Sequence, residues 1–126
     1  MAVKNVLIAG IDPDLVDFSM PGLPPGLNAA KLHAELKNTE ADLTGMGYAV
    51  EICFTDLGET GAAVVAERLK QKRFDCVMIG GGIRLPAPNL QFFERVINAV
   101  HEGAPQAKIC FNASATDMTA AVTRWV

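Results

Sequence analysis

The feature that most constrains the fold is a regular alternation of short apolar runs with segments of helical spacing. Four runs of strand length lie at residues 5–11, 48–54, 74–79 and 108–111. Runs that are apolar on both faces are typical of strands in a parallel sheet covered on both sides. A helical segment follows each run, and this order predicts an α/β fold with helices on both faces of the sheet.

The starts of the four expected helices are marked by residues that can accept a hydrogen bond from a first-turn N–H: Asn28, Asp56 with Glu59, Asn89, and Ser114 with Asp117. Gly45 and Gly47 are expected to end the first helix, and Gly103 with Pro105 the third. Helical spacing predicts that the inward faces carry the following apolar residues: Leu32, Leu36, Leu43 and Met46; Val64, Val65 and Leu69; Leu90, Phe93, Val96, Ile97 and Val100; Met118, Val122 and Trp125.

We predict a three-layer, doubly wound domain over residues 1–126, with a four-stranded parallel sheet in the order 2-1-3-4. The run at residues 5–11 is the most uniformly apolar and therefore belongs in the centre, and right-handed crossovers exclude most other orders. This architecture is flavodoxin-like or Rossmann-like, with one strand fewer than a flavodoxin. The fourth strand is then an edge that can pair with another chain, so a homodimer through this strand or the last helix is a hypothesis.

Composition restricts the partners and the location of the protein. The formal net charge is −3, and no basic stripe with interleaved aromatic residues is present, so nucleic acid is not an expected partner. The apolar stretches are strand-sized and the first residues lack the layout of a secretory signal, which favours a cytoplasmic protein without a membrane partner. Cys53, Cys76 and Cys110 have no metal-ligand spacing and are expected to be small, reduced core residues.

Two loops are expected to flank a ligand site, because open parallel sheets bind ligands beyond the carboxyl ends of their strands where the winding reverses. We name residues 12–27 the long loop and residues 80–88 the glycine loop. The long loop, DPDLVDFSMPGLPPGL, exceeds the usual length of about two to six residues for such a connection. It is either a functional lid or a structural flap that packs Phe18 and Leu23 onto the domain.

The glycine loop follows a buried strand and contains Gly80, Gly81, Gly82 and Arg84. Residues without side chains let a ligand approach the backbone, and their N–H groups with a following helix N-terminus can bind an anion. Arg84 could then pair with an anionic group of the ligand. The alternative is a tight turn in which glycine only permits a positive φ.

Polar residues at other strand ends complete the predicted site. Asn112 can both donate and accept a hydrogen bond to orient a ligand, whereas Ser114 either contacts the ligand or caps a helix. Asp12 and Asp14 would contact a hydroxyl, an amine or a metal ion. If the protein is an enzyme, Asp12 or His33 is the best general base, although the favoured interpretation of His33 is a surface or half-buried histidine without a catalytic role.

Several known signatures are absent: the phosphate loop GxxxxGK[ST], the dinucleotide fingerprint GxGxxG and the nucleophile elbow GxSxG. The four alternating units, with Asp12 and Asp14 after the first strand and Ser114 or Thr116 after the fourth, resemble a two-component receiver domain. The resemblance implies that the acidic pair could hold Mg²⁺. Gly80 to Gly82 stand where a receiver has its phosphate-accepting aspartate, so phosphoryl transfer is not expected. The chain is also similar to small, uncharacterised single-domain α/β proteins of bacteria.

The sequence therefore favours a protein that binds a small ligand bearing a carboxylate or a phosphate at the carboxyl edge of the sheet. The alternative is a receiver-like interaction module without catalysis, acting as a homodimer. A hydrolase or isomerase that uses the acidic residues is a third reading, and the residues do not separate these reaction classes. No cofactor is indicated apart from Mg²⁺ at the acidic pair.

Overall fold

The structure is a computed structural model that describes residues 3–56 and 60–126. Its sheet has four parallel strands in the order β2-β1-β3-β4. The predicted α/β class and the predicted strand order are both confirmed. The strands are β1 (Asn5–Ile11), β2 (Ala49–Thr55), β3 (Cys76–Ile79) and β4 (Lys108–Phe111).

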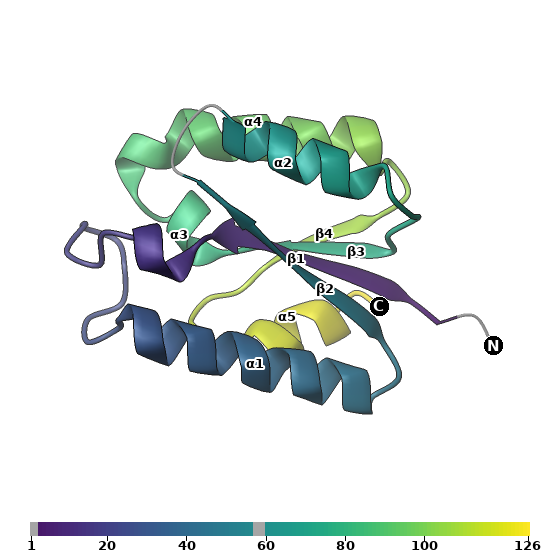
Figure 1. The fold of residues 1–126 in the computed structure, drawn as a ribbon, viewed down its shortest axis with the longest axis horizontal. Coiled ribbons are helices and arrows are strands. Elements are labelled where there is room, and N and C mark those ends of the chain that lie inside the picture. Colours follow the sequence, from purple (N-terminus) through teal and green to yellow (C-terminus); the bar gives the residue numbers. More distant parts are fainter. Residues whose placement is uncertain (1–2, 57–59) are drawn as a thin grey trace.

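The helices form the two outer layers. Figure 1 shows α2 and α4 on one face of the sheet and α1 and α5 on the other. The described residues contain five α-helices rather than the four expected, because the glycine loop itself forms a single helical turn, α3. None of these helices is long and apolar enough to cross a membrane. The helical elements are α1 (Ala29–Gly45), α2 (Thr60–Leu69), α3 (Gly81–Arg84), α4 (Leu90–Gly103) and α5 (Met118–Thr123), with 3-10 turns η1 (Pro13–Leu15) and η2 (Ala87–Asn89).

The side chains of β1 point alternately to the two faces of the sheet and so belong to two separate hydrophobic cores. Leu7 and Ala9 pack with α2 and α4, whereas Val6 and Ile8 pack with α1 and α5. β3 is buried on both faces for its whole length. Each of these two strands is covered on both sides, which explains their continuous apolar sequences.

The predicted helix starts have mixed outcomes. Asn28 caps α1, since its side-chain oxygen accepts the N–H of Lys31 at 2.9 Å. Asn89 precedes α4 but donates its side-chain N–H to the carbonyl oxygen of Gly82. The capping box predicted for Ser114 and Asp117 forms only in part. The Ser114 N–H donates to the Asp117 carboxylate at 2.9 Å, but α5 begins only at Met118, so Ser114 does not start the helix. The other predicted box includes Glu59, which lies outside the described residues.

Four apolar residues predicted to face inward are exposed instead: Met46 at 58%, Val64 at 39%, Leu90 at 59% and Trp125 at 56%. Met46 and Trp125 lie beyond the last residues of α1 and α5, and Leu90 is the first residue of α4. Val64 precedes the buried Val65 by one residue, and this step turns a helical side chain by about 100°. The spacing of apolar residues predicted where the helices lie, but it did not predict which apolar residues at their ends and edges would be exposed.

Candidate ligand site at the carboxyl edge of the sheet

The long loop and the glycine loop lie against each other, as the sequence predicted. Gly22 of the long loop has φ +99°, and a Cβ atom built there would stand 2.8 Å from the carbonyl oxygen of Leu85. A Cβ atom on Gly82 would meet Val16 Cγ2 at 3.9 Å. η1 and α3 accordingly occupy the same end of the molecule in Figure 1. The two loops therefore enclose the space beyond β1 and β3.

This space is a cavity of about 70 Å³. Its walls are mostly apolar and come from the long loop, the strand ends, α1 and α5. The long loop supplies one side, and the sheet and helices supply the rest: Val16, Phe18, Leu23, Pro24 and Leu27; Ile8, Ile11, Ile52, Phe54 and Met78; Leu32, Leu36 and Met118. The long loop thus covers the cavity with several of its apolar side chains.

The polar rim of the cavity carries five of the residues predicted for the site: Gly80, Gly81, Gly82, Asn112 and Ser114. The Gly80 N–H donates to the carbonyl oxygen of Ala9 at 2.8 Å and fixes the glycine loop to β1. The buried Asn112 donates its side-chain N–H to the carbonyl oxygen of Ser114 at 2.8 Å. These bonds hold the rim in place without the help of a ligand.

The glycine triplet does not need positive φ angles. The described glycines with positive φ are Gly22, Gly26 and Gly47, whereas Gly80 has φ −69°. The alternative in which the triplet serves a positive-φ turn is therefore wrong. Packing restricts two of the three positions: a Cβ atom would stand 3.1 Å from Leu85 Cδ1 at Gly81 and 3.4 Å from the Ala9 carbonyl oxygen at Gly80. Gly82 has room for a Cβ atom, and all three glycines line the cavity.

Sequence reasoning missed Gly10, which lies in β1 and lines the cavity. A Cβ atom built on Gly10 meets no atom within 4 Å, so neither packing nor a positive φ requires glycine there. A glycine within an apolar strand often marks a close approach of a ligand or another backbone. That signal was present in the sequence NVLIAGI.

Arg84 does not line the cavity. Its guanidinium donates to the carbonyl oxygen of Asn112 and lies 5.3 Å from the ring centroid of Phe111. Its Nε atom is buried without a hydrogen-bond partner. The pairing of Arg84 with an anionic ligand stays a prediction, and it requires the side chain to exchange these contacts.

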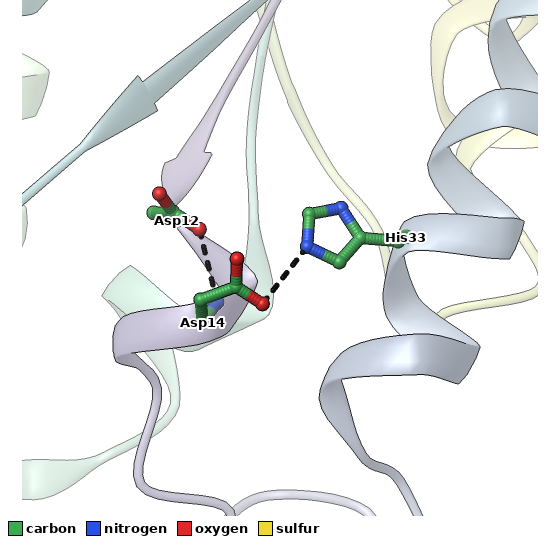
Figure 2. A group of neighbouring side chains, drawn as sticks. All are labelled: Asp12, Asp14 and His33. Atoms are coloured by element: carbon green, nitrogen blue, oxygen red, sulfur yellow. Dashed lines mark hydrogen bonds and ion pairs between the residues drawn. The ribbon is translucent and has the colours of Figure 1, made fainter.

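Asp12, Asp14 and His33 form a separate cluster beside the cavity (Figure 2). Asp12 Oδ1 accepts the Asp14 N–H at 2.9 Å, and His33 Nε2 lies 3.2 Å from Asp14 Oδ1. The His33 ring meets the ring of Phe54, a cavity residue, edge to face at 5.9 Å between centroids. None of the three lines the cavity, so their predicted contact with its ligand, and the general-base role of Asp12 or His33, remain predictions.

The three cysteines are buried and do not line the cavity. Burial raises the pKa of the Cys53 thiol. The hydrogen bond between Cys76 and Cys110, with 3.5 Å between the sulfur atoms, and burial together raise the pKa of the Cys76 thiol. The same hydrogen bond lowers the pKa of the Cys110 thiol. Since a thiolate is the reactive form of cysteine, the raised pKa values make Cys53 and Cys76 core residues rather than nucleophiles.

No known protein family and no curated protein matches the sequence. A doubly wound sheet hosts many unrelated functions and does not identify one by itself. The functional assignment therefore depends on the two loops, the cavity between them and the cluster beside it.

Proposed function

We propose that the protein binds a small molecule with an apolar body and one carboxylate or phosphate group in the cavity between the long loop and the glycine loop. The place of the cavity supports this proposal. Between β1 and β3 the winding of the sheet reverses, and crevices at such points are the usual ligand sites of open α/β sheets.

The observation that carries the proposal is the pair of side-chain-free positions at Gly10 and Gly82. Neither has a positive φ, and a Cβ atom on Gly10 would meet nothing within 4 Å. Glycine within a strand costs roughly 0.5–1 kcal/mol relative to alanine, so a cavity wall without side chains has a stability cost. A ligand that needs this space accounts for that cost.

The lining supports an apolar body for the proposed ligand and leaves the glycine backbone and Ser114 to meet its anionic group. Apolar walls favour a hydrocarbon or aromatic body, and the anionic group would lie at the rim formed by the glycine backbone and Ser114. A single carboxylate fits better than a doubly charged phosphate, because Asp12, Asp14 and Asp17 add negative charge to the long loop.

The size of the cavity limits the ligand. Its volume of about 70 Å³ is well below the roughly 300–1,000 Å³ of pockets for drug-sized molecules. Small aromatic or branched aliphatic carboxylates are therefore the first compounds to test, followed by their phosphate analogues. Larger ligands would require the long loop to move outward.

A valine at position 10 is expected to abolish this binding without harming the fold. In Gly10→Val the new side chain enters the cavity, and valine suits a strand better than glycine, so the melting temperature should stay the same or rise. The measurement is a thermal shift of the parent with the carboxylate panel, because a ligand of the native state raises its melting temperature. Any affinity found should then be measured by calorimetry in both proteins.

Gly45→Ala is the matched control for this experiment. Gly45 also has open space at its Cβ position, but it lies at the end of α1 and does not line the cavity. The control should bind each ligand as the parent does. Undiminished binding by Gly10→Val, or a panel in which neither carboxylates nor phosphates raise the melting temperature, would contradict the proposal.

A second candidate function is a homodimeric interaction module, favoured by the sheet edge formed by β4. β4 pairs with β3 on one side only, and the exposed side chains of Phe111 and Trp125 lie on β4 and directly after α5. Unpaired strand edges with exposed aromatic residues are suited to association with a second copy.

Light scattering coupled to gel filtration tests this second candidate. A dimer in the parent should dissociate in Trp125→Arg, because a charged side chain would replace the ring at the contact. Met46→Arg is the control, since Met46 is as exposed as Trp125 but follows α1. A parent that remains monomeric at high concentration, or a dimer that survives Trp125→Arg, would argue against association through this edge.

A further inference from the structure

We infer that Asp12, Asp14 and His33 form a binding site for a divalent first-row transition-metal ion such as Zn²⁺. This inference goes beyond the proposed function and does not depend on it, because none of the three side chains lines the cavity. The site is a mixed set of two carboxylates and one imidazole. Figure 2 shows the imidazole of α1 directed at the carboxylate of Asp14.

The donor atoms are already close to the spacing that a metal ion requires. One ligand atom from each of the three residues lies within 4.8 Å of the other two, and His33 Nε2 is 3.2 Å from Asp14 Oδ1. Bond lengths of about 2.0–2.2 Å to nitrogen and oxygen place neighbouring donors roughly 3.0–3.5 Å apart. The His33–Asp14 distance falls within that range, and the ligand atom of Asp12 lies within 4.8 Å of both.

The backbone holds the donors from two separate elements. Asp12 follows β1 directly, its N–H donates to the carbonyl oxygen of Thr55 at 2.9 Å, and η1 then positions Asp14. His33 lies 19 residues after Asp14, on α1, where its ring and that of Phe54 form a T-shaped pair. Acidic pairs in loops are common without a metal ion, but here an imidazole from another element converges on the pair.

The donor set selects the kind of metal. Imidazole nitrogen is a good ligand for Zn²⁺, Co²⁺ and Ni²⁺, whereas Mg²⁺ and Ca²⁺ prefer sites made of oxygen atoms alone. Two carboxylates balance the charge of a dication. The Asp14 and His33 side chains are 71% and 38% exposed, which leaves room for water or another small ligand on the metal. Sites with three protein donors and an open position are typical of reactive rather than structural metal centres.

Cobalt is the probe for the first experiment, because its absorption spectrum reports the coordinating atoms. Titration of the metal-free full chain with Co²⁺ should give d–d absorption that saturates at one ion per chain, and Zn²⁺ should displace the Co²⁺. Mg²⁺ should not compete at millimolar concentration. His33→Ala should weaken Zn²⁺ binding by about tenfold or more in calorimetry, and Asp14→Asn should also weaken it.

His101→Ala is the matched control, since His101 is the other histidine of the chain and lies in the last turn of α4. It should bind Co²⁺ and Zn²⁺ as the parent does. Gly10→Val should also keep full metal affinity, which separates this inference from the proposed ligand cavity. Melting curves without metal would show that each variant is folded.

Three results would overturn the inference. The first is no saturable Co²⁺ or Zn²⁺ binding by the parent chain. The second is binding that His33→Ala leaves unchanged while the variant remains folded. The third is a preference for Mg²⁺ over Zn²⁺, which would assign the acidic pair to an oxygen-only site without His33.

Discussion

Gly22→Ala is expected to destabilise the protein by about 2–4 kcal/mol. Gly22 has φ +99°, a conformation that costs a residue with a side chain about 1–2 kcal/mol, and the new Cβ would stand 2.8 Å from the backbone oxygen of Leu85. Because Leu85 belongs to the glycine loop, the variant should also lift the long loop from the cavity. Urea unfolding measures the loss of stability, and hydrogen exchange measures the opening of the long loop.

Gly26→Ala separates the two causes. Gly26 also has a positive φ, of +80°, but a Cβ atom there meets nothing within 4 Å. In this control the free energy of unfolding should fall only by the cost of the positive φ, about 1–2 kcal/mol. The long loop should stay closed. Equal losses in the two variants would mean that the contact between the two loops contributes little to stability.

The stability of the protein is expected to fall as the pH rises above about 8.5 because of two of its buried thiols, those of Cys53 and Cys76. The pKa values of Cys53 and Cys76 are raised, so both thiols ionise at a higher pH in the folded chain than in the unfolded chain. In the unfolded chain their pKa is about 8.5, so above that pH the unfolded state holds fewer protons and is favoured. The hydrogen bond with Cys76 lowers the pKa of Cys110, so this third thiol does not add to the decline. Each of the two raised thiols then costs about 1.4 kcal/mol per pH unit. Urea unfolding at a series of pH values measures this slope.

The double variant Cys53→Ala/Cys76→Ala removes the two thiols whose pKa values are raised and keeps Cys110, tyrosine and lysine. Its stability at neutral pH should be lower, because both sulfur atoms are buried, but its decline above about pH 8.5 should be much shallower. In the parent, thiol reagents should react slowly until the chain unfolds. A slope that the double variant leaves unchanged would show that these thiols ionise equally in both states.

The site was partly predictable, and the reasons differ among residues. The glycine loop and the long loop could be brought together from the sequence, because parallel strands deliver their following loops to one edge of the sheet. The contacts of the Arg84 side chain could not be predicted from the order of strands and loops. Its side chain can reach several groups, and only the fold shows that it contacts the carbonyl oxygen of Asn112 and the ring of Phe111.

The convergence of His33 on Asp14 was also outside the reach of sequence reasoning. The sequence placed His33 near the start of a helix at the same edge of the sheet, but not the direction of its ring. The rotation of α1 about its axis decides this direction, and it is set by the packing of Leu36 and Leu43 against the sheet. A small change in that rotation would move the imidazole away from the carboxylate.

The amino-acid sequence alone determined the α/β class, the strand order and the edge at which the two loops meet, because these follow from local periodicity, helix signals and the handedness of crossovers. The tertiary structure decided the shape of the cavity, the open space beside Gly10, the contacts of Arg84 and the cluster around His33. These features depend on distances between side chains far apart in the chain. Such distances result from the packing of whole layers and are not encoded in any short segment.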